Sequence, residues 1–317
     1  MKLCMIGTGY VGLVSGVCFA DIGNQVVCVD KDKNKIDKLN SGISPIYEPG
    51  LDELIKKNFV AKRLSFTTDI DKAISISDII FICVGTPTSK GSIKVDLSFV
   101  YKCTKEILKY SKRKKIIVTK STVPVGTGDE IEKILKRKKK LFTVISNPEF
   151  LREGEAIRDF RYPDRIVIGS NEKKAFNIMK KLYVPLTNKG SKFFTTSRRG
   201  AELIKYASNA FLATKITFIN ELANLCEKSG VNIEDISLGM GSDSRIGGRF
   251  LRAGPAYGGS CFPKDTKGLV AAAEKYKINL SVVKSVIKSN QERVNLLTKR
   301  VHKILGSNLK NKKISFL

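Results

Sequence analysis

The motif GTGYVG follows directly after a short apolar run, and this junction constrains the fold of the chain more than any other feature. The run Lys2–Ile6 has the length of a strand, and the segment Val11–Ile22 has helical spacing. The glycines Gly7, Gly9 and Gly12 permit a tight turn, let the backbone approach a pyrophosphate and allow the helix to pack closely. The sequence therefore predicts a strand, a turn and a helix that bind a dinucleotide.

Four more strand-length apolar runs follow, and segments with helical spacing lie between several of them. This order predicts an α/β fold in which an N-terminal Rossmann-like parallel sheet is covered by helices on both faces. A mainly helical central domain follows it. Ligands of such sheets bind beyond the carboxyl ends of the strands. The further runs are Val26–Val29, Ile79–Val84, Ile116–Thr119 and Phe142–Ile145, and one helical segment is Leu97–Leu108.

Polar residues follow several of the predicted strands. Asp30 ends the second strand, at the spacing where a carboxylate accepts hydrogen bonds from the adenosine ribose, and it favours NAD over NADP because it repels a 2′-phosphate. The alternative is a glycine-rich turn with a surface aspartate. Later strand ends are small or polar too, although each also suits an ordinary strand-to-helix turn. They are Gly85, Thr86 and Pro87, then Ser121, Thr122, Val123 and Pro124, then Asn147, Pro148 and Glu149.

A long segment without proline, Ala201–Ser229, predicts a helix that ends at Gly230. Its apolar excess suits a buried connector or a dimer-forming helix. Lys205 and Asn209 are four residues apart and share one face. In apolar surroundings the pKa of the lysine falls, which suits proton exchange or stabilisation of an oxyanion. The alternative is a lysine that extends to solvent beside an exposed asparagine.

The octapeptide GGSCFPKD places Cys261 between two glycines and a Lys/Asp pair. A predicted helix begins just after the thiol, and Lys264 lies beside it; both favour the thiolate and hence a nucleophile. A lone cysteine is otherwise an inert core residue. The only histidine, His302, lies in a lysine-rich stretch, so proton transfer falls to Lys, Glu, Asp or water. The loop-rich segment Asp243–Gly259 suits a phosphorylated ligand.

Composition limits the remaining classes. The 317 residues suffice for about two domains, and 42% hydrophobic with 27% charged residues is typical of a globular protein. The net charge of +27 raises the alternative of a nucleic-acid site, but the lysines are scattered and no nucleic-acid motif accompanies them. We expect the densest runs, Lys112–Lys115 and Lys136–Lys140, to face solvent. No apolar run reaches membrane-span length and no signal peptide is evident, which indicates a cytoplasmic protein. The seven cysteines lack metal-ligand spacing, so we expect no metal and mostly reduced core thiols.

Several motifs together resemble the UDP-glucose/GDP-mannose dehydrogenase family over the whole chain. They are GTGYVGL, YEPGL at Tyr47–Leu51, STVPVGTG from Ser121, NPEFLREG from Asn147, PDRIVIG from Pro163 and YGGSCFPKD from Tyr257. The resemblance implies an NAD-dependent, two-step oxidation of UDP-glucose to UDP-glucuronate. It also implies that the cysteine captures the aldehyde as a thiohemiacetal, which becomes a thioester that water hydrolyses. The alternatives are a related dehydrogenase acting on GDP-mannose or a UDP-N-acetylhexosamine, and a truncated remnant that binds NAD without turnover.

The resemblance also implies roles for individual residues. Lys205 stabilises the oxyanion and Asn209 helps to hold it, Asp265 with Thr122 orients water, and Glu149 is the general base. NAD contacts are expected at Gly7, Gly9, Val11, Gly12, Asp30, Lys35, Thr86, Thr122, Glu153 and Lys264. Sugar-nucleotide contacts are expected at Phe150, Leu151, Arg152, Glu153, Lys205, Asn209, Phe250, Leu251, Arg252, Ala253, Gly254 and Gly258, and at Arg245, which reaches into a neighbouring subunit's site.

The expected organisation has an NAD-binding domain (1–196), a helical dimerisation and cysteine domain (197–304), and the first strand of a truncated UDP-binding domain (305–317). Its last segment, Lys312–Leu317, reads as that strand, so we expect the chain to bind NAD and to hold UDP-glucose weakly. A homodimer is expected through the helix 201–229. The helical pattern of Ser281–Ile304 is expected to pack against that helix, with His302 facing solvent.

Overall fold

The structure is a computed structural model that describes residues 1–88, 94–306 and 308–315, without the side chains of Arg137 and Lys139. It divides into two units, Met1–Lys205 and Tyr206–Leu317, each described here by itself. In the described residues the first unit has the strands β1 (Lys2–Ile6), β2 (Gln25–Val29), β3 (Leu64–Thr67), β4 (Ile79–Ile82), β5 (Lys115–Thr119), β6 (Phe142–Ser146), β7 (Arg165–Ser170) and β8 (Lys192–Thr196). Its helices are α1 (Tyr10–Asp21), α2 (Lys33–Asn40), α3 (Leu51–Val60), α4 (Ile70–Ile76), α5 (Ser98–Tyr110), α6 (Thr127–Leu135), the 3₁₀ helix η1 (Lys136–Leu141), α7 (Ala156–Arg161) and α8 (Lys173–Thr187).

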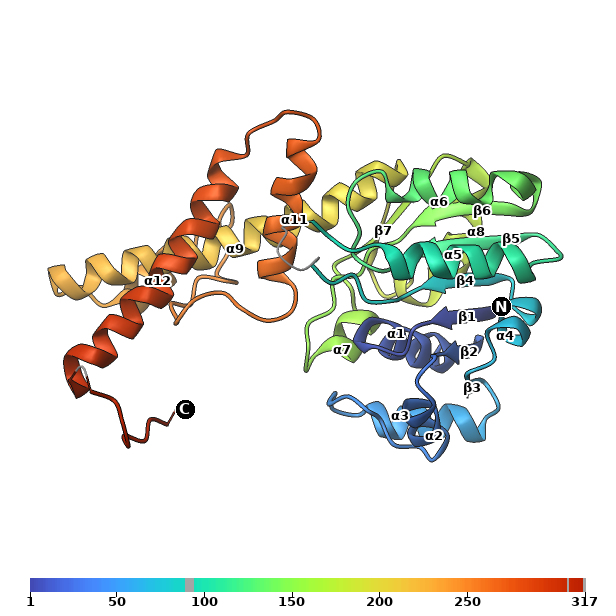
Figure 1. Cartoon of the computed structure of the whole chain (residues 1–317), viewed down its shortest axis with the longest axis horizontal. Coiled ribbons are helices and arrows are strands. Elements are labelled where there is room, and N and C mark those ends of the chain that lie inside the picture. The colour runs from blue at the N-terminus through green and yellow to red at the C-terminus, as the bar shows by residue number, and fades with distance from the viewer. Residues whose placement is uncertain (89–93, 307, 316–317) are drawn as a thin grey trace. The chain divides into compact units, whose positions relative to one another are not determined.

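The strands form one sheet in the order β3-β2-β1-β4-β5-β6-β7-β8. All neighbours are parallel except β6 and β7, which are antiparallel. The chain reverses its direction of winding between β1 and β4, so the turns that follow these strands and β5 open at one edge of the sheet. Figure 1 shows the sheet with helices on both faces. The predicted α/β fold is confirmed.

Each face of the sheet carries its own hydrophobic core. Leu13 of α1, Ile55 of α3 and Met179 of α8 are fully buried against one face. Val100 of α5 and Ile131 of α6 are fully buried against the other. Apolar side chains therefore cover both sides of the central strands, which explains why those strands are nearly continuous hydrophobic runs in the sequence.

All five predicted strands are present, whereas β3, β7 and β8 were not predicted. Strands β3 and β8 lie at the two edges of the sheet, and their side chains are partly exposed. Edge strands do not need the continuous apolar run of a central strand, so they carry a weaker sequence signal.

The expectation that the run Lys112–Lys115 faces solvent is wrong for Lys115. This side chain is 2% exposed, and its ammonium group donates hydrogen bonds to the carbonyl oxygens of Ile74 (2.6 Å), Ser75 (3.0 Å) and Ser77. These carbonyls end α4, where a cation satisfies groups that have no partner inside the helix. Lys115 therefore acts as a cap for a neighbouring helix.

The second unit is helical in its described residues. The helix α9 (Arg198–Ser229) enters it at Tyr206, and α10 (Ile233–Gly241), α11 (Phe262–Glu274) and α12 (Ser281–Leu305) follow. Tyr206 of α9 packs with Leu269 of α11 and Val283 of α12, as predicted for the last helix, and His302 is exposed. Among the described residues, no helix combines the length and the apolar composition needed to cross a membrane. Residues 312–315 form no strand, in contrast to the sequence prediction, while 316–317 lie outside the described residues.

Candidate active site

The glycine turn after β1 has the shape that the dinucleotide prediction requires. A Cβ atom at Gly12 would lie 1.9 Å from the carbonyl oxygen of Gly7, so only glycine lets α1 pack this closely against the turn. A Cβ atom at Gly9 would meet nothing within 4 Å, which leaves open space beside the first turn of α1. No side chain caps this helix end, so its N–H groups are available to an anion.

Asp30 lies beside this turn and is held by it. One carboxylate oxygen accepts hydrogen bonds from the Thr8 N–H (2.9 Å) and the Thr8 hydroxyl (2.8 Å), and the other accepts one from the Asp32 N–H (3.1 Å). Burial by itself would raise the pKa of Asp30, but these donors and Lys35 hold the pKa below its usual value. Asp30 is therefore an oriented carboxylate, and Oδ1, which accepts a single hydrogen bond, keeps lone-pair capacity for a hydroxyl donor.

The turns after β4 and β5 are joined to each other. The Thr86 hydroxyl donates to the Thr122 carbonyl oxygen (2.9 Å), and the Ser121 hydroxyl donates to the Val84 carbonyl oxygen (2.7 Å). A small hollow in this unit is lined by Thr122, Ser146, Glu202 and Lys205, among others. The predicted polar strand ends are thus brought together at one edge of the sheet.

Lys205 is the last residue of the first unit and is 4% exposed. Its ammonium group donates to the Glu149 carboxylate over 3.2 Å and lies 5.2 Å from the centre of the Phe150 ring. Glu149 follows β6 and also accepts a hydrogen bond from the Leu151 N–H. Lys205 and Glu149 therefore form a buried ion pair. The interpretation of Lys205 as a lysine extending to solvent is therefore excluded.

The segment Phe150–Glu153 is predicted to contact the sugar nucleotide. Phe150 also lies under the guanidinium of Arg165, 3.9 Å from the ring centre. Arg152 is exposed and forms a two-pronged contact with Asp159, with its Nε at 3.0 Å and its Nη2 at 2.6 Å from the carboxylate oxygens. The adjacent Glu153 is exposed. The segment therefore presents charged side chains and an aromatic ring that lies against the guanidinium of Arg165.

In the second unit, Cys261 is exposed and directly precedes α11. Its carbonyl oxygen accepts the Asp265 N–H (2.8 Å), and its sulfur lies 3.6 Å from the Ser260 hydroxyl. Gly259 has a φ of +75°, so the chain turns sharply just before the thiol. Cys261 is thus accessible at a helix N-terminus, and the inert-core interpretation of this cysteine is excluded.

A buried carboxylate follows the thiol four residues later in the sequence. Asp265 is 0% exposed, and its two oxygens accept hydrogen bonds from Lys264 Nζ (2.7 Å) and from Asn209 Nδ2 (2.6 Å). Lys264 is therefore paired with Asp265 in this structure. The predicted residues Asn209, Lys264 and Asp265 therefore form one hydrogen-bonded network, with Asp265 at its centre.

The predicted ligand loop of this unit is held by α9 and α12. The Gly254 N–H donates to Asn220 (2.7 Å), and the Gly254 carbonyl oxygen accepts two bonds from Arg293 (3.2 and 3.1 Å). Phe250 has a φ of +66°, which is strained for a bulky residue and marks a tightly specified turn. The Arg245 side chain is 87% exposed and is paired with Asp243, so it projects to solvent in this chain.

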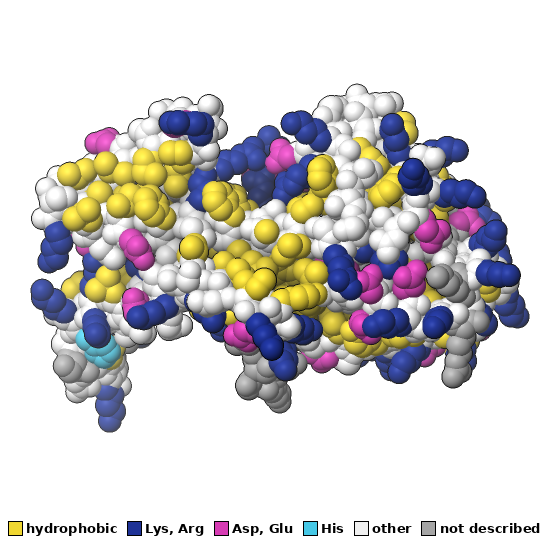
Figure 2. All heavy atoms as spheres, turned by 90° about the horizontal axis from the view of Figure 1, so that it is seen from above, with side chains coloured by type: hydrophobic (Ala, Val, Ile, Leu, Met, Phe, Trp, Pro, Cys, Tyr) yellow, Lys and Arg dark blue, Asp and Glu magenta, His cyan; other side chains and the backbone are white. Residues whose placement is uncertain are grey.

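The basic side chains and the cysteines bear on what the composition predicts about surface charge and metal binding. Figure 2 shows Lys and Arg scattered over the displayed face with Asp and Glu between them, as expected of a solvated basic surface. Within the described residues all seven cysteines are unpaired, and Cys103 and Cys261 are the two that are not buried. Among the same residues no cluster of three His, Cys, Asp or Glu side chains could hold a metal ion.

The structure also brings in residues that sequence reasoning missed. Glu202 is 3% exposed, and its carboxylate accepts the N–H groups of Gly126 (2.7 Å) and Gly128 (2.8 Å) and the Ser146 hydroxyl (3.1 Å). It thereby joins α9 to the turn that carries Thr122. The available signal was its position three residues before Lys205, on the same side of the helix.

Models of one protein family match both parts of the chain. The NAD-binding-domain model of the UDP-glucose/GDP-mannose dehydrogenase family matches residues 1–187, and the central-domain model of that family matches residues 199–292. The chain belongs to the UDP-glucose/GDP-mannose dehydrogenase family. Family membership places it among dehydrogenases whose first domain binds NAD.

Similar proteins agree with this family. UDP-glucose 6-dehydrogenase of Rhizobium meliloti strain 1021 is 51% identical over 321 residues, covering 100% of this chain and 74% of that protein. TuaD, a UDP-glucose 6-dehydrogenase of Bacillus subtilis strain 168, is 49% identical over 100% of this chain and 68% of that protein. A UDP-glucose dehydrogenase structure from Pyrobaculum islandicum has a TM-score of 0.91 at 36% identity, covering 96% of this chain and 71% of that one. A GDP-mannose dehydrogenase structure from Pseudomonas aeruginosa has a TM-score of 0.75 at 34% identity, covering 94% and 71%.

Proposed function

We propose that this chain is an NAD-dependent UDP-glucose 6-dehydrogenase that converts the C6 alcohol of UDP-glucose to the carboxylate of UDP-glucuronate. The single observation that supports this best is the exposed thiol of Cys261 at the start of α11, four residues before the buried carboxylate of Asp265. A nucleophilic thiol is needed where an aldehyde must be held and oxidised again. The names of the 51% and 49% identical relatives favour UDP-glucose as the sugar nucleotide.

NAD, when bound, supplies the hydride acceptor for each oxidation. The glycine turn fits this group, since the space beside Gly9 is open and α1 presents uncapped N–H groups to a pyrophosphate. Asp30 is oriented to accept hydrogen bonds from a ribose. Further contacts are proposed for Val11, Lys35, Thr86, Thr122, Glu153 and Lys264.

The thiol divides the oxidation into separate steps. The first oxidation removes a hydride and a proton from the C6 alcohol and leaves the aldehyde. Cys261 Sγ then adds to the aldehyde carbon, and the oxygen takes up a proton to give a thiohemiacetal. Removal of a second hydride and a proton gives a thioester, and water cleaves its C–S bond to release the carboxylate and the thiol. Two NAD molecules are consumed per sugar.

The buried polar groups are proposed to stabilise and move charge in these steps. The Lys205 ammonium stabilises the oxyanion, and Asn209, whose amide is held by Asp265, helps to hold it. Asp265 and Thr122 orient water for thioester hydrolysis. Glu149 takes the proton of that water, and the Lys205 ammonium, which donates a hydrogen bond to it, holds this carboxylate in position.

The sugar nucleotide is proposed to lie along Phe150–Glu153 and Phe250–Gly254, with Gly258 nearby. A homodimer through α9 is part of this proposal. Its exposed side chains Phe211, Phe218 and Leu225 are 66%, 47% and 61% exposed and follow one another at intervals of seven residues, so they form an apolar stripe along the helix. Arg245 would reach the partner's site. The unpaired cysteines suit a reducing compartment such as the cytoplasm.

The test is NADH formation by this 317-residue chain with a panel of sugar nucleotides at equal concentration. UDP-glucose is expected to give the highest kcat/KM, with GDP-mannose and UDP-N-acetylmannosamine as the competitors. A higher kcat/KM for either competitor would assign the chain to a related activity in the same family. NAD binding without NADH formation from any of them would contradict the proposed activity.

A further inference from the structure

The YEPGL motif contributes a buried carboxylate that the proposed chemistry does not use. Glu48 is 6% exposed and accepts three hydrogen bonds. One carboxylate oxygen accepts the Tyr10 hydroxyl and the Gly154 N–H (2.9 Å), and the other accepts the Ile157 N–H (3.1 Å). A buried carboxylate that is this fully hydrogen-bonded fixes the relative positions of its donors.

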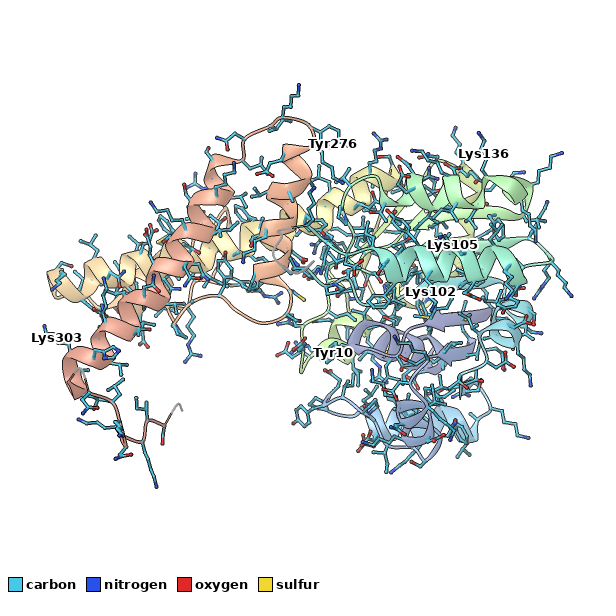
Figure 3. The ribbon with its side chains drawn as sticks, viewed as in Figure 1. Tyr10, Lys102, Lys105, Lys136, Tyr276 and Lys303 are labelled. Carbon is cyan, nitrogen blue, oxygen red and sulfur yellow. The ribbon has the colours of Figure 1, made fainter. Side chains whose placement is uncertain are left out.

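The donors come from two segments, the dinucleotide turn and the segment proposed to contact the sugar nucleotide, whose Glu153 is also predicted to contact NAD. Tyr10 is the first residue of α1 and lies inside the glycine motif of the dinucleotide turn. Gly154 directly follows the segment 150–153, which is proposed to contact the sugar nucleotide. The Gly154 N–H also donates to the Tyr10 hydroxyl (2.7 Å), so the tyrosine bridges both partners. Figure 3 labels Tyr10 at the end of α1 that lies beside α7.

The framework around Glu48 leaves this carboxylate little freedom. The main-chain carbonyl oxygen of Glu48 accepts the Leu51 N–H (3.1 Å), and Gly50 has a φ of +81°, so the backbone turns directly into α3. On the other side, α7 is held to α1 by an edge-to-face contact between Phe19 and Phe160, whose ring centres are 4.9 Å apart. A shift of Tyr10 must therefore be transmitted to Gly154 or break a hydrogen bond of this network.

The tyrosine also stays a donor under physiological conditions. Burial, the hydrogen bond to Glu48 and the nearby carboxylates raise the pKa of Tyr10, although the Gly154 N–H opposes the shift. The phenol therefore remains protonated at neutral pH and continues to donate to the carboxylate.

We propose that Glu48 and Tyr10 are positioning residues that link the dinucleotide turn to the sugar-nucleotide segment, so that NAD binding at the turn orders residues 150–157. The proposal rests on the proposed function for the identity of the two ligands. An anion at the N-terminus of α1 fixes the first turn of that helix, and Tyr10 passes this order to Glu48 and Gly154. Because coupling between two sites is reciprocal, an ordered segment would also favour NAD.

The experiment measures hydrogen exchange of the backbone amides in residues 150–157, with and without saturating NAD, on the full chain. NAD is expected to slow exchange of the Gly154 and Ile157 amides by about fivefold or more, the lower end of typical coupling between sites. In Tyr10→Phe, which keeps the ring and removes the hydroxyl, this slowing is lost, and by reciprocity the NAD dissociation constant from calorimetry rises by no more than the same factor, so saturation with NAD is still reached. The matched control is Tyr47→Phe in the same motif, since Tyr47 is 86% exposed, and it should behave as the unmodified chain does.

Glu48→Gln gives a second test that leaves Tyr10 intact, and it should also lose the NAD-dependent slowing. Equal slowing in Tyr10→Phe, Glu48→Gln and the unmodified chain would overturn the proposal, as would NAD binding that leaves exchange of these amides unchanged in the unmodified chain. Failure of the unmodified chain to bind NAD at all would be a different result. It would contradict the proposed function and the link together.

Discussion

Replacement of Glu202 by glutamine tests the electrostatics around the proposed site. Burial raises the pKa of Glu202 to about 7, although the N–H groups of Gly126 and Gly128 and the Ser146 hydroxyl oppose the shift. The ionisable and charged groups around it are Asp129, which adds to the shift, Arg198, which is paired with Asp129 over 2.8 Å, Tyr101 and Lys205. The carboxyl group is thus protonated in the folded chain at pH values where it is ionised in the unfolded chain.

The sign and the size of the effect follow from linkage. Below the ordinary pKa of 4.5, both the folded and the unfolded chain bind the proton and Glu202 contributes no pH dependence. Between 4.5 and about 7 the folded chain binds more protons, so the free energy of unfolding falls as pH rises. Above about 7 the loss is complete, and it amounts to about 3 kcal/mol at about 1.4 kcal/mol per pH unit.

The assay is urea denaturation of the unmodified chain and of Glu202→Gln at intervals from pH 4.5 to 8. The free energy of unfolding of the unmodified chain, minus that of the variant, should fall by about 3 kcal/mol across this range, because glutamine does not titrate. Subtracting the two removes the contribution of every other titrating group. The control is Glu53→Gln, which removes an exposed carboxylate on α3 and keeps Glu202, so the fall of about 3 kcal/mol should not appear in its difference. A constant difference for Glu202→Gln would refute the reasoning.

Three further substitutions have distinct expected outcomes. Gly12→Ala would place a Cβ atom 1.9 Å from the carbonyl oxygen of Gly7, so thermal melts should show that the first unit is unfolded. In Gly9→Ala the added Cβ atom meets nothing within 4 Å, so the melting temperature should be kept while calorimetry shows weaker NAD binding. Asp30→Asn removes a carboxylate whose pKa is lowered in the folded chain. The unmodified chain should therefore be more stable than the variant above the ordinary pKa of 3.8, and it should lose this advantage as pH falls through the folded-state pKa. Acid titration of both chains, followed by circular dichroism, checks this. Asp265→Asn should slow thioester hydrolysis more than thioester formation, so intact-protein mass spectrometry should detect accumulated acyl-enzyme; a variant that turns over as fast as the unmodified chain would show that Asp265 has no such role.

The sequence predicts the central sheet well because its signal is local. Lys2–Ile6 is a continuous apolar run followed at once by glycines, and the structure has a strand over the same residues. The edge strands β3 and β8 lack such a run, because one side of an edge strand does not need to be buried. Local composition is equally uninformative for Lys115, since the carbonyls that it caps lie about forty residues earlier in the chain.

In the candidate site, too, the sequence predicts local features and misses long-range contacts. Cys261, Lys264 and Asp265 lie within five consecutive residues, so their residue types alone predict a thiol near a charged pair. Glu202 and Glu48 contact backbone N–H groups that are between 74 and 109 residues away, and no spacing rule finds such partners in a single sequence. The exposed apolar stripe of α9 can be predicted only in part. Helical spacing predicts that its side chains share one face of the helix, but not that this face remains exposed.

The central claim is that the thiol of Cys261 carries the sugar through the second oxidation. The most direct measurement is the yield of UDP-glucuronate and NADH from UDP-glucose with the unmodified chain, Cys261→Ala and Cys103→Ala, the last being a thiol that is also not buried. The account predicts two NADH per UDP-glucuronate for the unmodified chain and for Cys103→Ala, and no UDP-glucuronate from Cys261→Ala. Formation of UDP-glucuronate by Cys261→Ala would contradict it.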